Sequence, residues 1–71
     1  MSEEIIIGSL LTKIMRYSKK YEISVQFWPD QWAIFINKDG IELTSFGGEP
    51  ENTLRRGVEY LDRINRVSAK V

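Results

Sequence analysis

The sequence predicts a single α+β domain in which helix, strand, strand, strand and helix follow one another along the 71 residues. Apolar residues recur every three or four positions at both ends of the chain and every second position in the middle. In addition, Asp39-Gly40 is typical of a two-residue hairpin turn. We therefore expect a three-stranded antiparallel meander with both helices packed on one face, spanning residues 1–71 as one domain.

The first helix is predicted before Glu22. Acidic Glu3 and Glu4 stand near its start and basic Lys19 and Lys20 at its end, where the helix dipole favours each sign of charge. Its start is left open between Ser2 and Ser9. The apolar stripe of this helix is formed by Ile7, Leu10, Leu11, Ile14, Tyr17 and Tyr21.

The last helix is predicted to begin near Pro50, whose missing N–H is no loss in a first helical turn. Gly57 lies on the apolar side and is expected to let the helix backbone approach the sheet closely. The apolar stripe comprises Leu54, Val58, Leu61, Ile64 and Val67.

The turns predict the register of the strands. The strands are expected at Glu22–Trp28, Trp32–Lys38 and Ile41–Phe46, and Gly47-Gly48 ends the sheet. An even loop at Asp30-Gln31 pairs Val25 with Ile36, and the Asp39-Gly40 turn pairs Ile36 with Leu43 and Ala33 with Phe46. The face expected beneath the helices then comprises Ile23, Val25, Phe27, Ile34, Ile36, Ile41 and Leu43.

The same register gathers four apolar residues on the face that the helices leave open. These predicted partner-binding residues are Trp28, Ala33, Phe35 and Phe46. Large exposed apolar patches usually mark interfaces, so we expect a protein partner, a second copy of the chain in a homodimer, or both. The alternative is that the chain ends or a tilted helix cover the patch, or that the register differs by one residue and the faces are exchanged.

Charge argues against a strong duplex-binding surface, because ten basic residues balance ten acidic ones. It argues equally against an acidic mimic of DNA. The single-sign basic stretch is Lys13, Arg16, Lys19 and Lys20, which are candidate contacts to phosphates or to an acidic protein. The alternative for these four residues is a solubilising helix face.

Catalytic chemistry is poorly represented. The sequence has no histidine and no cysteine, and its carboxylates are not spaced for a metal. Gly47-Gly48 lacks the following lysine of a phosphate-binding loop. We therefore predict no catalytic residue, no metal site, no cofactor and no enzymatic activity. Because no signal peptide or membrane span is evident either, we expect a cytoplasmic protein.

The order of the elements resembles that of double-stranded-RNA-binding domains. That family carries a lysine cluster at the start of its last helix, whereas residues 49–56 of this chain open with acids. It also has a histidine in a strand-connecting loop, which this chain lacks. The resemblance is thus limited to the order of the elements, and no RNA-contact residue follows from it.

Residues 32–61 resemble parts of many small proteins encoded by phages and prophages. The shared features are a Trp-x-Ile strand, an Asp-Gly turn, a strand ending in Phe-Gly-Gly, and Thr53-Leu54 opening a helix. Such proteins commonly bind and inhibit host proteins, including defence nucleases. This resemblance implies a non-enzymatic inhibitor acting by stoichiometric binding. The alternative is a nucleic-acid-binding accessory protein that uses the open sheet face and the basic first helix.

Overall fold

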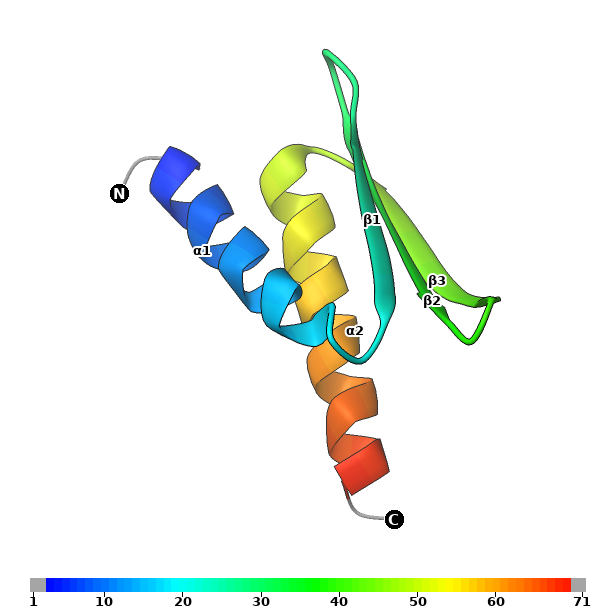
Figure 1. Ribbon diagram of the computed structural model, residues 1–71. Coiled ribbons are helices and arrows are strands. Elements are labelled where there is room, and N and C mark those ends of the chain that lie inside the picture. The colour runs from blue at the N-terminus through cyan, green and yellow to red at the C-terminus, as the bar shows by residue number, and fades with distance from the viewer. Residues whose placement is uncertain (1–2, 70–71) are drawn as a thin grey trace.

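The computed structural model describes residues 3–69, which form two helices around a three-stranded sheet (Figure 1). The elements are α1 (Glu3–Tyr17), β1 (Glu22–Phe27), β2 (Trp32–Lys38), β3 (Ile41–Gly48) and α2 (Pro50–Ala69). This is the predicted α-β-β-β-α order. Ser2, one limit of the predicted helix start, lies outside the described residues.

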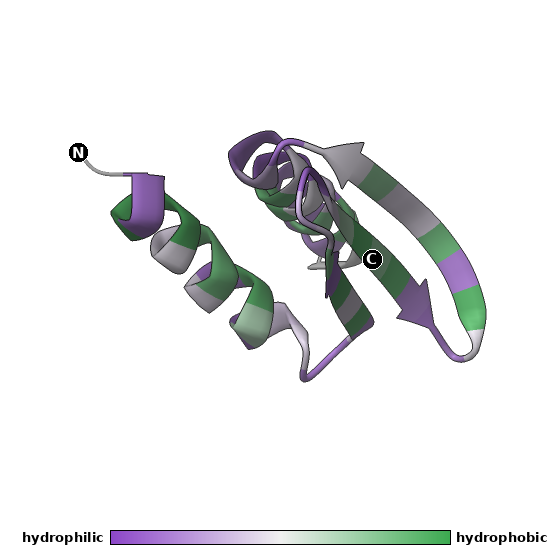
Figure 2. Cartoon of the chain, turned by 90° about the horizontal axis from the view of Figure 1, so that it is seen from above, coloured by the Kyte–Doolittle hydropathy of each residue, from purple (hydrophilic) through white to green (hydrophobic). Residues whose placement is uncertain are grey.

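The sheet is an antiparallel meander in the order β1-β2-β3, as predicted. Both helices pack on the same face of it, and polar and apolar residues alternate along the strands (Figure 2). The core lies between these two layers because the helices and the sheet each turn an apolar side towards the other. Its buried apolar members are Leu10, Ile14, Tyr21, Ile34, Ile36, Leu54, Val58 and Leu61.

Helix α1 ends earlier than its apolar stripe suggests. The carbonyl oxygen of Tyr17 accepts hydrogen bonds from the amides of Lys20 and Tyr21, each at 2.9 Å, and these close the turn into β1. Tyr21 therefore belongs to the turn and not to the helix. Its side chain is nevertheless buried, and its ring centroid lies 6.5 Å from that of Tyr17.

Helix α2 lies close to β2 at Gly57, as predicted. A Cβ atom at this position would stand 2.8 Å from Cδ1 of the fully buried Ile34. One turn earlier, Thr53 is also buried, and its hydroxyl donates a hydrogen bond of 3.5 Å to the carbonyl of Trp32. The absence of a side chain at Gly57 thus lets the helix settle on the central strand.

The β1–β2 hairpin has a register two residues away from the predicted one. Val25 pairs with Ile34, and the amide of Trp28 donates a 2.8 Å hydrogen bond to the carbonyl of Gln31. Pro29 and Asp30 therefore form the turn, and the prediction of an Asp30-Gln31 loop is wrong. Proline has no N–H for the strand ladder and a φ suited to the first central position of a turn, which favours this placement.

The β2–β3 hairpin begins as predicted, but a bulge then changes its register. Asp39 and Gly40 form the turn with φ values of 53° and 78°, and Lys38 pairs with Ile41. Asn37 pairs with Glu42, but Ile36 pairs with Thr44, so Leu43 has no partner on β2. An extra residue of this kind is a β-bulge.

The bulge reverses the faces of the rest of β3. Phe46 pairs with the fully buried Ile34 and so lies on the helix side, which makes its predicted place on the open face wrong. Leu43, the bulge residue, was predicted beneath the helices but is 39% exposed; Ile41 was predicted there too and keeps its predicted pairing with Lys38, yet it is 66% exposed beside the turn. The alternative of a one-residue change in register is therefore correct for this part of β3.

Candidate functional site

The open face of the sheet carries two of the four predicted partner-binding residues. Ala33 and Phe35 alternate along β2 with Ile34 and Ile36, which are buried beneath the helices, so they lie on the opposite face. Both are half-buried. The strand neighbours of Phe35 are Ser24 and Ser45, two small polar residues. Phe35 is therefore the large apolar side chain at the centre of this face.

Phe46 does not take part in that face. Its ring lies 6.3 Å from the ring of Tyr60 in α2, measured between centroids, with the two planes at 65°. This contact belongs to the packing of β3 against α2. The four residues predicted as one partner-binding cluster are therefore not brought together.

The most exposed aromatic residues lie at the end of the β1–β2 hairpin. Phe27 and Trp28 are 59% and 43% exposed. The Phe27 ring meets the half-buried Trp32 ring edge-on, with centroids 4.4 Å apart and planes at 83°. Figure 1 shows this hairpin projecting past the start of α2. We call Phe27, Trp28, Pro29 and Trp32 the aromatic tip.

Phe27 was predicted to lie beneath the helices because it alternates with the strand in step with Ile23 and Val25. The alternation is right, but the end of β1 extends past the helices, so they do not cover Phe27. A usable signal was present in the sequence: residues 27–32 read Phe-Trp-Pro-Asp-Gln-Trp. Three aromatic residues around a proline-containing turn suggest an exposed aromatic surface, because a tight turn cannot bury all of them.

The four predicted basic residues all lie around the C-terminal end of α1 and the turn that follows. Lys13 and Arg16 line a hollow of about 340 Å³ together with Tyr17 and Asp62. Lys19 and Lys20 line a second hollow of about 200 Å³ next to it along the chain. The basic stretch of the sequence is thus a set of cations beside two surface depressions.

Tyr17 and Asp62 connect the two helices inside the first hollow. The Tyr17 hydroxyl donates a hydrogen bond to the Asp62 carboxylate, which raises the pKa of Tyr17, and burial raises it further. The phenol therefore stays protonated at neutral pH and is no ready base or nucleophile. The pair is best explained as a structural link between α1 and α2.

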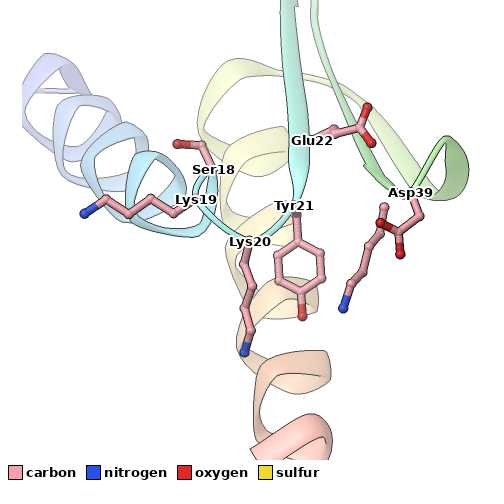
Figure 3. Close-up of a pocket in the computed structure, with 7 residues that line it drawn as sticks. Ser18, Lys19, Lys20, Tyr21, Glu22 and Asp39 are labelled. Carbon is pink, nitrogen blue, oxygen red and sulfur yellow. The ribbon is translucent and has the colours of Figure 1, made fainter.

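In the second hollow, Tyr21 stands between residues of two turns (Figure 3). Lys20 Nζ donates a 3.0 Å hydrogen bond to Asn65 Oδ1 of α2, and Lys38 Nζ lies 5.4 Å from the Tyr21 ring centroid. Glu22 Oε1 accepts a 3.2 Å hydrogen bond from the amide of Gly40. Two lysines that are 18 positions apart, Lys20 and Lys38, therefore line the same hollow as Tyr21.

Within residues 3–69, no three Asp, Glu, His or Cys side chains lie close enough to hold a metal ion. Neither α1 nor α2, over that same range, is long and apolar enough to cross a membrane. Comparison with protein-family models, with curated proteins and with solved structures finds no match for this chain. The geometry of the molecule itself must therefore carry the functional argument.

Proposed function

We propose that this chain is a non-enzymatic protein-binding module and that its aromatic tip is the principal contact surface. The observation that carries this proposal is the exposure of Phe27 and Trp28 on a hairpin that projects beyond the helices. Interface hot spots are enriched in tryptophan and tyrosine, which bring a large contact area with few rotatable bonds.

The packing inside the tip also supports binding. The edge-on contact with Trp32 restrains the Phe27 ring on one side before any partner arrives. Association costs less when the contacting side chains are already ordered, because less rotamer freedom is lost. Trp28, beside this pair, is the best candidate for an anchor that enters a pocket of the partner.

The open sheet face adjoins the aromatic tip but lies on the other side of the sheet. Ala33 pairs with Gln26 next to the Phe27–Trp32 pair, and Phe35 follows two positions along β2, whereas the Trp32 side chain packs on the helix side. A partner therefore contacts Ala33 and Phe35 together with Phe27 only if it reaches both faces of the hairpin. Phe46 is not part of the surface, because it faces α2.

The partner that we propose is a different protein in the cytoplasm of the cell in which the chain is made. Inhibition of a host protein, such as a defence nuclease, by a phage or mobile element is the form of binding suggested by the resemblance of residues 32–61. The choice of a host target rests on that resemblance alone. The sequence also suggested a homodimer, and the same experiments measure self-association of the chain.

Nucleic-acid binding through the sheet is less well supported. That alternative needs Trp28, Phe35 and Phe46 as stacking platforms on one open surface. Phe46 packs against Tyr60 on the opposite side of the sheet, so the platform loses one of its three rings. Protein binding requires no such row of rings, and we therefore favour it.

The test compares Trp28→Ala with Met15→Ala. Met15 is 69% exposed on α1 and so controls for the loss of an exposed apolar side chain elsewhere. We expect a host protein to be retained by the immobilised wild type and by Met15→Ala, and its affinity for Trp28→Ala, measured by calorimetry, to fall by about 2 kcal/mol or more.

Both variants should keep the wild-type melting temperature to within a few degrees, since neither side chain belongs to the core. Sedimentation velocity on the same samples reports self-association. If Trp28→Ala and Met15→Ala bind the purified partner equally well, the contact surface lies elsewhere. If Trp28→Ala abolishes only a dimer, the tip is a self-association surface and the proposed host partner is wrong.

A further inference from the structure

The hollow around Tyr21 is lined by three lysines from two separate parts of the chain, Lys19 and Lys20 in one part and Lys38 in the other. Lys20 precedes β1 and Lys38 ends β2, and the hollow between them measures about 200 Å³. Tyr21 is 4% exposed, so its ring is a fixed part of the core and gives the hollow a rigid wall. Figure 3 shows the Tyr21 hydroxyl and the side chain of Lys20 directed the same way, along α2.

Both ammonium groups are positioned by uncharged partners. Lys20 Nζ is held by the amide oxygen of Asn65 at 3.0 Å, and Lys38 Nζ lies over the Tyr21 ring at 5.4 Å. Arg55 and Glu51 form an ion pair, and among the side chains that the structure describes neither Lys20 nor Lys38 forms one. Each ammonium group therefore has a contact that leaves its charge without a carboxylate partner within ion-pair distance.

The carboxylates of Glu22 and Asp39 also line this hollow, but Glu22 is bonded to the β2–β3 turn and Asp39 is part of that turn. Glu22 accepts a hydrogen bond from the amide of Gly40, and Asp39 occupies a turn position with a φ of 53°. In Figure 3 the Glu22 carboxylate points from β1 toward the β2–β3 turn, away from the Lys20 ammonium. Neither carboxylate is within ion-pair distance of a lysine in the described residues.

We propose that this hollow binds a phosphate group between the ammonium groups of Lys20 and Lys38. A phosphate monoester carries a charge of about −1.5 to −2 at pH 7, which matches two ammonium groups better than a single carboxylate does. Lysine is a common phosphate ligand acting as a point charge, and the Tyr21 hydroxyl supplies a further donor at the same wall.

This phosphate site is separate from the aromatic tip. The turn before β1 and the β2–β3 turn lie at the end of the sheet opposite the tip (Figure 1). A phosphorylated ligand at Lys20 and Lys38 leaves Phe27 and Trp28 uncovered. A test of phosphate binding at this site is therefore independent of a test of protein binding at the aromatic tip.

The test is a titration with inorganic phosphate, followed by the backbone amide signals in NMR spectra at constant ionic strength. We expect saturable shifts confined to residues 18–22 and 37–40. Lys20→Gln and Lys38→Gln should each weaken binding about tenfold or more, as expected for the loss of a charge-assisted contact. Lys13→Gln is the matched control, because Lys13 lines the hollow at Tyr17 and Asp62 and not this one.

Three results of this titration overturn the proposal. They are shifts no larger than those caused by chloride at the same ionic strength, an equal loss of affinity in Lys13→Gln, and an absence of saturation. A second arm uses single-stranded oligonucleotides with and without a 5′-phosphate. Binding that requires the terminal phosphate supports the site, whereas equal binding of both indicates diffuse recognition of the nucleic-acid backbone and also overturns it.

Discussion

The two hairpins share β2 but depart from their expected registers in different ways. In the β1–β2 hairpin the pairing moves by two residues, so Val25 meets Ile34 instead of Ile36. In the β2–β3 hairpin one extra residue, Leu43, enters β3 after a correctly predicted turn. A change of two residues leaves every side chain on its face, whereas one extra residue exchanges the faces beyond it.

The two-residue change in the β1–β2 register therefore affects the core less than the single extra residue in β3 does. Ile23 and Val25 pack against the core although their partners differ from those predicted. Beyond the bulge, Phe46 takes a place on the helix side, and Leu43 is left partly exposed. For a sheet with one covered face, the parity of the register decides which residues form the core.

The largest expected effect is that of Ile36→Ala, because Ile36 belongs to both hairpins. It pairs with Ile23 in one and with Thr44 in the other, and it is fully buried. We expect the free energy of unfolding to fall by about 2–5 kcal/mol, in a domain with about 5 kcal/mol in total. Urea unfolding followed by circular dichroism measures this, and a loss below about 1 kcal/mol contradicts a shared core at β2.

Phe46→Ser and Phe35→Ser compare the two faces directly. Phe46 lies on the helix side against Tyr60, whereas Phe35 lies on the open face between two serines. We expect Phe46→Ser to destabilise the fold by about 1–3 kcal/mol and Phe35→Ser by clearly less, because Phe46 packs against the core and Phe35 does not. Thermal unfolding of both variants checks the order. If Phe35→Ser is the more destabilising variant, the regular β2–β3 register without a bulge is correct instead.

Most of the fold could be predicted because it depends on strong local signals. The two apolar periods place the helices and strands, and Asp39-Gly40 tolerates the positive φ values that its turn requires. The bulge could not be predicted, because nothing at Leu43 distinguishes an extra residue from a regular one. It follows from packing, which places the large Phe46 ring beside Tyr60 in the core.

The candidate site was predicted in part. Ala33 and Phe35 lie on the face away from the helices as expected, because the β1–β2 register moved by an even number of residues, whereas Trp28 lies at the hairpin turn. The pairing of Phe27 with Trp32 needed the turn to be placed at Pro29-Asp30. Lys38 contacts Tyr21 although the two residues are far apart in the sequence, and no periodic pattern in the sequence predicts such a contact.

Single-residue deletions test how the hairpins differ in tolerance. Deleting Leu43 should restore regular pairing and leave Phe46 facing Ile34, because the bulge residue has no partner. Deleting Ser24 should force either Ile23 or Val25 off the helix side, at a cost of about 1–2 kcal/mol for partly buried residues. Urea unfolding should therefore find the Ser24 deletion the less stable. Equal losses would mean that the bulge is needed in its own right.

The smallest expected effect concerns Gly57, where α2 meets the strand that the hairpins share. In Gly57→Ala the new Cβ would lie 2.8 Å from Ile34 Cδ1, so overpacking of about 1–3 kcal/mol opposes a gain of about 1 kcal/mol in helix propensity. We expect a net loss of up to about 2 kcal/mol. Ile34→Val removes Cδ1, so adding Gly57→Ala to that variant should be neutral or stabilising. A double-mutant cycle of urea unfolding curves measures this coupling, and additive losses would show that α2 does not approach β2 through this atom.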